Sequence, residues 1–175
     1  MATRPQRLPQ QIDPFRLAET GRSLAGPLPL AGLDRLAPLL AADGGEVEVE
    51  LSFARAPQGG HVAEGTVRGR LRLVCQRCLQ PVTVEVDIPV RLAFVHHEAE
   101  MAGLGPEYEP CLVGEDALRL ADVVEDELLL ALPQVPMHPP EACPAARAAA
   151  PETEPEPERE HPFAALAQLK KTDTD

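Results

Sequence analysis

The stretch that decides the fold runs from Thr66 to Phe94 and reads TVRGRLRLV, then CQRC, then LQPVTVEVDIPVRLAF. On both sides of Cys75-Gln76-Arg77-Cys78, apolar side chains alternate with polar ones. A period of two over this length is typical of half-buried antiparallel strands. The stretch therefore predicts a hairpin whose tip holds two thiols side by side.

The neighbouring segments extend this hairpin into a domain. Glu46 to Arg55 alternates in the same way, and the loop from Pro57 to Gly60 joins it to the hairpin as a third antiparallel strand. Ala121 to Leu132 is the best candidate for a long helix, with an apolar stripe formed by the residues listed here: Leu120, Val123, Val124, Leu128 and Ala131. Laying this helix on the apolar face of the meander gives an α+β fold.

Shorter elements precede and follow the meander. Asp13 and Pro14 predict the start of a short helix that ends at Thr20, and Leu33 to Leu40 predicts a second one. Ser23 to Leu30 predicts an edge strand, because its prolines are excluded from a sheet centre. Residues 96–107 read as a mobile loop and residues 109–113 as one more strand.

Composition divides the chain into four parts. Residues 1–11 read as a disordered arm, residues 12–144 as a single domain, and residues 145–161 as a disordered linker rich in proline and glutamate. Residues 162–171 are predicted to form a short amphipathic helix in which Phe163, Leu166 and Leu169 share one side. An apolar segment on such a tether is expected to dock on its own domain or on a partner.

The overall charge restricts the function. The formal net charge is −12, which argues against binding nucleic acid over a broad surface. Trp is absent, so a base-stacking platform would be poor. No signal peptide opens the chain, and no apolar run approaches the ~20 residues of a membrane helix. We expect a cytoplasmic protein with reduced thiols and no membrane partner.

The four cysteines allow a metal site. Cys75 and Cys78 lack the strand–helix context of a thioredoxin-like motif and instead supply half of a tetrahedral zinc site. His138 and Cys143, in the loop after the main helix, could supply the other half. The alternative is two buried thiols with an unrelated surface histidine. Cys111, inside an apolar strand, is predicted to belong to the core.

Arginines follow the hairpin. They form either a narrow stripe for phosphate or cross-strand ion pairs that specify register, and the pairs are favoured for Arg68 and Arg70. The expected pairs are Glu50 with Arg68, Glu48 with Arg70 and Glu46 with Arg72 in the first hairpin, and Arg70 with Glu85 and Arg68 with Asp87 in the second. Arg72 and Arg77, near the tip, are freer to touch a partner.

No catalytic pattern is present in the sequence. Glu125, Asp126 and Glu127 are consecutive on a helix and point in different directions, so we interpret them as a solvated face. Neither a Ser/His/Asp order nor a phosphate loop nor a dinucleotide fingerprint occurs. The residues thus indicate a binding or assembly protein, not an enzyme.

Three motifs carry a resemblance to a known family. VCQRCLQPV, VEDELLLALPQVPMHPPEAC and HPFAALAQLKK occur in this order and resemble the bacterial large ribosomal RNA subunit accumulation protein family (YceD-like), from about Ile12 to Lys171. By position the motifs place Cys75 and Cys78 in the knuckle, His138 and Cys143 after the helix, and Pro162, Phe163, Leu166 and Leu169 in the tail.

The resemblance implies a cytoplasmic factor needed for the synthesis, processing or stability of 23S rRNA. Some relatives have more cysteines after the helix, which implies a metal site there, whereas this chain has His138 and one cysteine. The implied partner is a large-subunit rRNA precursor or a ribosomal protein, and no small-molecule substrate. The alternative is a protein–protein adaptor, stapled by zinc or a dithiol, that affects rRNA only indirectly.

Overall fold

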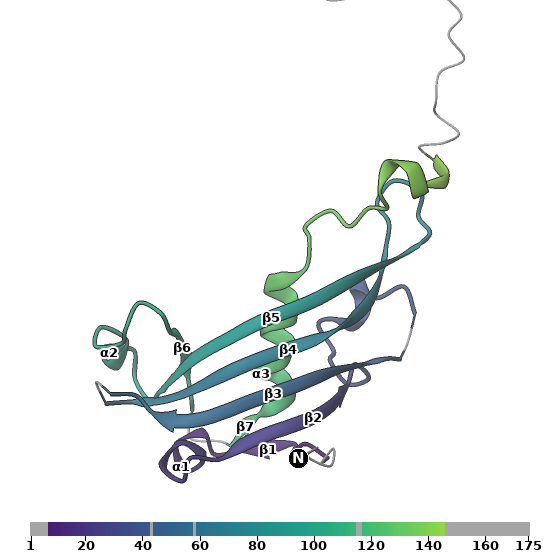
Figure 1. The fold of residues 1–175 in the computed structure, drawn as a ribbon. Coiled ribbons are helices and arrows are strands. Elements are labelled where there is room, and N and C mark those ends of the chain that lie inside the picture. Colours follow the sequence, from purple (N-terminus) through teal and green to yellow (C-terminus); the bar gives the residue numbers. More distant parts are fainter. Residues whose placement is uncertain (1–6, 43, 58, 115–116, 146–175) are drawn as a thin grey trace, which may run out of the picture.

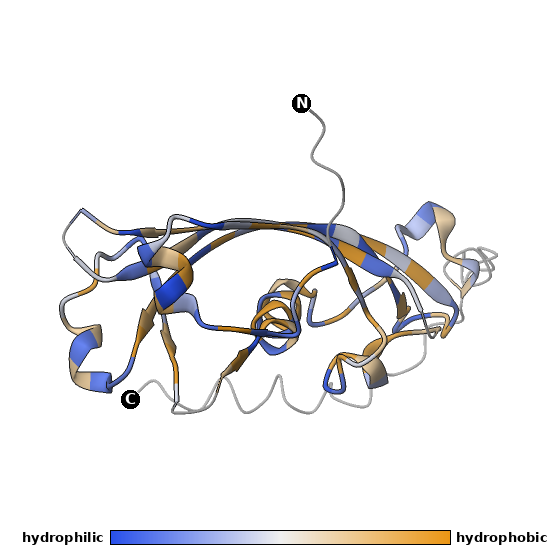
Figure 2. Cartoon of the chain, turned by 90° about the horizontal axis from the view of Figure 1, so that it is seen from below, coloured by the Kyte–Doolittle hydropathy of each residue, from blue (hydrophilic) through white to orange (hydrophobic). Residues whose placement is uncertain are grey.

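The alternating segments form one curved sheet that arches over a single long helix (Figures 1 and 2). The structure is a computed structural model that describes residues 7–42, 44–57, 59–114 and 117–145. The elements are β1 (Gln11–Ile12), α1 (Pro14–Glu19), β2 (Ser23–Pro29), η1 (Ala37–Leu39), β3 (Glu46–Arg55), β4 (His61–Val74), β5 (Pro81–Val95), α2 (Glu98–Met101), β6 (Glu109–Leu112), β7 (Leu118–Arg119), α3 (Leu120–Ala131) and η2 (Pro140–Ala142).

The main sheet has five strands in the order β2-β3-β4-β5-β6. The first four are consecutive and antiparallel, as the period-two pattern predicts. β6 is different, because it pairs in parallel with the end of β5, Leu92 lying opposite Glu109. The expected loop between β5 and β6 contains the short helix α2. This connection carries the chain back along the sheet to Leu92, so that β6 runs in the same direction as the last residues of β5.

The apolar face of the sheet packs against α3. Figure 2 shows the sheet arched over α3, with hydrophilic and hydrophobic residues alternating along the strands. Val47, Val49 and Val67 from the strands are fully buried, as are Leu120 and Leu128 from the helix. The α+β class is therefore confirmed. Ala131, which we placed in the helical stripe, is exposed because the helix ends there and leaves the sheet.

The segment between β2 and β3 is irregular where a second helix was predicted. Leu33 and Leu36 are buried, but only Ala37–Leu39 forms a helical turn, of the 3₁₀ type. Pro38 lacks the N–H that a continuing α-helix would need. The first predicted helix is confirmed, and the side chain of Asp13 caps it by accepting the backbone N–H of Arg16 at 3.0 Å.

The register of β3 on β4 corrects one prediction. Arg68 lies opposite Glu48, and Glu50 lies opposite Thr66, so the predicted pairing of Glu50 with Arg68 is wrong by two residues. The same shift removes the pairing of Glu48 with Arg70 and of Glu46 with Arg72. The last paired residues are Arg55 and His61, and a backbone hydrogen bond from Ala56 to Gly60 closes the loop earlier than we expected.

A second correction concerns Glu125. Its side chain is buried, and its Oε1 atom accepts the backbone N–H groups of Arg35 at 2.8 Å and Leu36 at 3.0 Å. The guanidinium of Arg35 donates to the other oxygen at 2.9 Å. Glu125 thus fastens α3 to the loop after β2 and does not belong to a solvated face.

The N-terminal residues pair with the segment before α3. Gln11, at the end of the predicted arm, pairs with Arg119 in a small two-stranded sheet that the sequence pattern did not predict. The predicted linker from residue 146 onward and the predicted helix 162–171 lie outside the described residues. Within the described part of the chain, no helix is long and apolar enough to cross a membrane.

Candidate metal centre

The tip of the β4–β5 hairpin is a tight loop built around Cys75. The backbone N–H of Cys75 donates to the carbonyl of Gln80, and Leu79 donates back to the carbonyl of Cys75, both at 2.9 Å. Leu79 has φ 58°, the only positive value of a non-glycine residue in the described ranges. This turn brings Cys75 and Cys78 together at the end of two paired strands, as predicted.

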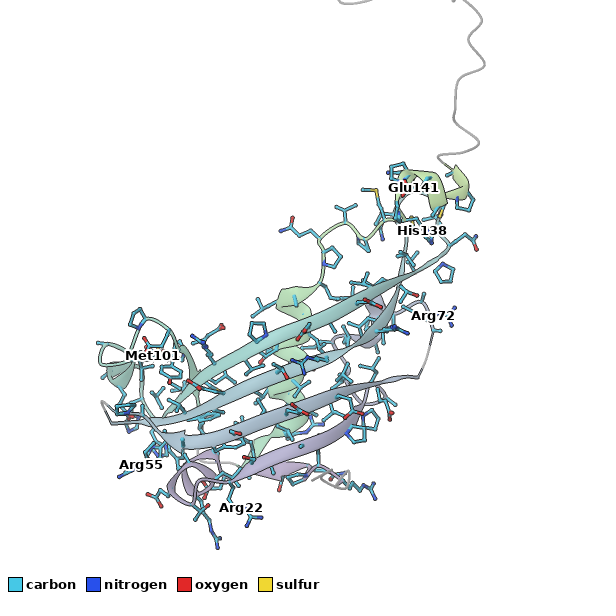
Figure 3. The ribbon with its side chains drawn as sticks, in the orientation of Figure 1. Arg22, Arg55, Arg72, Met101, His138 and Glu141 are labelled. Atoms are coloured by element: carbon cyan, nitrogen blue, oxygen red, sulfur yellow. The ribbon has the colours of Figure 1, made fainter. Side chains whose placement is uncertain are left out.

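The segment after α3 runs back to this tip. Gln76 donates its backbone N–H to the carbonyl of Pro136 at 2.9 Å, and His138 donates its own to Cys75 Sγ at 3.5 Å. A short 3₁₀ turn, η2, then places Cys143. Figure 3 shows His138 and Glu141 beside the hairpin tip, at the end of the molecule far from Arg22 and Arg55.

Four donor atoms meet at this point. The sulfurs of Cys75, Cys78 and Cys143 and a ring nitrogen of His138 all lie within 4.8 Å of one another. Cys75 and Cys143 are buried, whereas Cys78 and His138 are half-buried. The spacing of two pairs on either side of the main helix therefore identified residues that the fold brings together. Cys111 lies in β6, outside this cluster.

The histidine is oriented by its second nitrogen. Nδ1 of His138 is 3.4 Å from Cys78 Sγ, and Nε2 is 3.0 Å from the carbonyl oxygen of Pro81. A carbonyl can only accept, so Nε2 carries the proton and the lone pair of Nδ1 faces the thiols. Metal-binding histidines are held in this way by a carbonyl or carboxylate on the other ring nitrogen.

The thiols differ in acidity. Burial raises the pKa of Cys75, but the backbone N–H groups of Cys78, His138 and Arg77 outweigh it and lower the pKa to about 5. A backbone N–H from Gln80 acts to lower the pKa of Cys78, yet burial and the neighbouring Cys75 and Cys143 raise it overall. Adjacent thiolates repel one another, so a cation among them would favour their ionised forms.

The donor set fits zinc. Three thiols and one imidazole nitrogen form a common set for a closed, four-coordinate structural site. Ligands about 2.3 Å from a tetrahedral centre are about 3.8 Å apart, and the four donor atoms here all lie within 4.8 Å of one another. Cys75, Cys78, His138 and Cys143 could therefore hold a zinc ion that ties the exit of α3 to the hairpin.

Two of the arginines form the ion pairs that were predicted for the second hairpin. Arg68 Nε is 2.9 Å from Asp87 and Arg70 Nε is 3.0 Å from Glu85. Among the described residues, neither Arg72 nor Arg77 forms an ion pair, and the guanidinium of Arg77 donates a hydrogen bond to the sulfur of Met137 at 3.7 Å. Phe163, Leu166 and Leu169 lie outside the described ranges.

Sequence reasoning missed the apolar residues around the knuckle. Leu79 is 71% exposed, and Val135 and Met137 are exposed as well. The sequence did contain a signal for this surface. Val135 and Met137 flank Pro136 in the proline-rich loop after the main helix, where no strand or helix pattern would bury them.

Taken together, the sheet, the long helix α3 and the thiol–histidine cluster define an α+β protein with a candidate metal knuckle, and comparison with known proteins identifies its family. Residues 63–170 match the family described as large ribosomal RNA subunit accumulation protein YceD. A Haemophilus influenzae protein called large ribosomal RNA subunit accumulation protein YceD is 34% identical over 168 residues, which cover 94% of this chain and 97% of the relative. The chain belongs to this family. No solved structure matches it.

Proposed function

We propose that this protein is a non-enzymatic ribosome biogenesis factor that promotes accumulation of the large ribosomal subunit through the synthesis, processing or stability of 23S rRNA. The observation that carries the proposal is the near full-length match to a relative whose name states a role in large ribosomal RNA subunit accumulation. In this proposal the protein acts in the cytoplasm, on a large-subunit rRNA precursor or a ribosomal protein. The test is to deplete the protein from cells and measure the ratio of 23S to 16S rRNA, which should fall.

Direct contact with RNA would use the hairpin tip. Arg72 and Arg77 support this because no carboxylate among the described residues pairs with them. Crosslinking in cells, followed by sequencing of attached RNA, should recover 23S precursor fragments. Arg72→Ala with Arg77→Ala should reduce the yield, whereas Arg68→Ala, which removes an arginine already paired with Asp87, is the matched control.

The alternative is an adaptor that acts on rRNA through another protein. The net charge of −12 and the exposed apolar residues Leu79, Val135 and Met137 favour this reading. An adaptor would yield no 23S fragments above background in the crosslinking experiment. It would still show the lowered ratio of 23S to 16S rRNA on depletion.

Zinc at the knuckle would have a structural role in either case. We propose Cys75, Cys78, His138 and Cys143 as its ligands. Their function would be to hold the loop after α3 against the hairpin tip and so to present the apolar residues and Arg77 in one arrangement.

The tail is proposed as a second contact. A short helix over residues 162–171, on the acidic linker of residues 145–161, would present Phe163, Leu166 and Leu169 to a partner on the assembling subunit. Replacing Phe163 and Leu166 by Ala should reduce co-sedimentation with large-subunit precursors and leave the thermal midpoint unchanged, with Gln168→Ala as the control. Normal co-sedimentation would exclude the tail as the docking element, and a midpoint several degrees lower would mean that it packs on its own domain.

A further inference from the structure

Most of strand β5 has a partner on only one side. β4 pairs with β5 along its whole length, from Pro81 to Phe94. On the other side β6 pairs only with residues from Leu92 onward. Between Pro81 and Arg91, no strand in the described ranges covers the outer edge of β5, which borders the sheet in Figure 1.

The backbone groups on this edge can be identified by their alternation. The carbonyl of Val95 accepts the N–H of Val113 on the outer side, and the carbonyl of Pro81 accepts from His138 on the same side. The register with β4 is unbroken between Pro81 and Phe94. The backbone N–H and C=O groups of every second residue of β5 therefore point away from β4, toward the outer edge. The outward residues with an N–H are therefore Thr83, Glu85, Asp87 and Arg91.

The prolines agree with this assignment. Pro81 and Pro89 are both outward residues of β5, where a missing N–H costs no bond to β4. Pro89 also limits the usable edge. Three consecutive outward N–H groups, at Thr83, Glu85 and Asp87, and the carbonyls beside them remain as a template for a further strand.

The chemistry around the edge favours positive charge. Glu85 and Asp87 project from the edge strand on the polar face, where Arg70 and Arg68 already pair with them, so the surplus of negative charge lies at the end of the edge. At its Pro89 end lies a cleft of about 510 Å³ whose lining includes Glu107, Glu109 and Glu127, with Arg91 as the only basic residue. Burial, and to a smaller extent the nearby Glu109, raise the pKa of Glu127, so a cation in the cleft would favour its ionised form.

The opposite face of the edge is apolar. Val84 is half-buried at the rim of the core, and Leu130 is 72% exposed. Leu130 follows Glu127 by three positions on α3, so both lie on one side of the helix. An incoming strand would thus meet the carboxylates of Glu85 and Asp87 on the polar face, and the aliphatic side chain of Val84 together with the carboxylate of Glu127 on the face that α3 covers.

We propose that the β5 edge from Thr83 to Asp87 docks an extended, positively charged segment of another protein, which adds a strand to the sheet. This deepens the proposed function, because it names the chemistry of a protein partner, and it rests on that function only for the identity of the partner. The segment would alternate basic and aliphatic residues and place a basic side chain in the cleft beside Pro89.

Amide exchange of the purified full-length protein tests this directly. The probe is the peptide KVKTKVKTK, and the controls are KVPKTPKVPK, whose prolines prevent strand pairing, and the acidic EVETEVETE. With the probe, exchange at Thr83, Glu85 and Asp87 should slow by at least about tenfold, while Val84 and Val86, already bonded to β4, change little. No change, or equal protection by the proline control, would overturn the proposal. Slow exchange at all three amides in the free protein would also overturn it, because the edge would then be occupied already.

A backbone variant provides the second test. Glu85→Pro removes one outward N–H and the negative charge of the side chain. Glu85→Thr removes the same charge but keeps the N–H. The dissociation constant of the probe should be about tenfold higher for Glu85→Pro than for Glu85→Thr, with circular dichroism confirming that both fold. Equal affinities would contradict strand addition. A failure here would leave the ratio of 23S to 16S rRNA on depletion unaffected, so the two proposals fail separately.

Discussion

The two ends of α3 are held to the sheet by different forces. Near its start and middle, Leu120, Val124 and Leu128 are buried and Glu125 binds the loop after β2. Beyond the helix, residues 133–145 are all described, and Cys143 is the only buried one among them. The first region is fastened mainly by apolar burial, whereas the second is held by the cluster of three cysteines and one histidine and by a few backbone hydrogen bonds.

This difference indicates which conditions each region senses. Apolar burial is indifferent to oxidants and chelators, so the sheet and α3 should remain folded when either is added. The knuckle end buries little apolar surface, since Leu79, Val135 and Met137 are exposed, and its order should depend on the state of the thiols. In such a protein the sheet and α3 can keep one arrangement while the surface at the hairpin tip changes with the state of the thiols.

The largest effect is expected from the core. Leu128→Ala removes a fully buried side chain and should lower the free energy of unfolding by about 2–5 kcal/mol in urea titrations. Leu130→Ala, two residues away on the exposed side, should change it by less than about 0.5 kcal/mol. Equal effects of the two substitutions would contradict the packing described here.

The Glu125 contact should come next. Glu125→Ala leaves the backbone N–H groups of Arg35 and Leu36 without an acceptor and should cost about 2 kcal/mol. Burial alone would raise the pKa of Glu125, but these two donors and the Arg35 guanidinium lower it in the folded protein.

A lowered pKa in the folded state fixes the sign of the pH dependence. The stabilisation is present above the unfolded pKa of about 4.3 and is lost as the pH falls through the lower folded value. The difference in thermal midpoint between the wild type and Glu125→Gln should therefore shrink on acidification. A difference that grew toward low pH would mean that the carboxylate is not the stabilised form.

The knuckle should respond locally. Protein purified without chelator should contain about one equivalent of zinc by elemental analysis, and Cys143→Ser should contain less than about a tenth. Chelation should speed amide exchange in residues 75–80 and 136–143 while leaving β3 and β4 unchanged. Cys111→Ser, outside the cluster, is the matched control. Less than about a tenth of an equivalent in the wild type would rule out zinc as the staple.

The smallest effect is expected at the surface. Arg70 and Glu85 are 76% and 74% exposed, so breaking their ion pair with Arg70→Ala should change stability by less than about 1 kcal/mol. A larger loss would show that cross-strand pairs, and not only the core, hold the hairpin. Thermal unfolding at low and high salt measures this term, because salt screens exposed charges.

The sequence by itself determined the parts that depend on near neighbours. The alternation from Thr66 to Phe94 specified two strands, and their short connection specified the partners Arg68–Asp87 and Arg70–Glu85. Side-chain periodicity is a local property of the backbone, so it can be read without knowing the path of the rest of the chain. The two pairs of candidate ligands, Cys75 with Cys78 and His138 with Cys143, were readable for the same reason, as spacings within single loops.

The tertiary structure alone decided the rest. The register of β3 on β4 depends on how the loop from Ala56 to Gly60 closes, and the parallel direction of β6 depends on the path through α2. The burial of Glu125 required Arg35 to arrive from a distant segment. The meeting of Cys75 and Cys78 with His138 and Cys143 required α3 to end beside the hairpin tip. Contacts between distant segments depend on the sum of many weak packing energies, which no local pattern records.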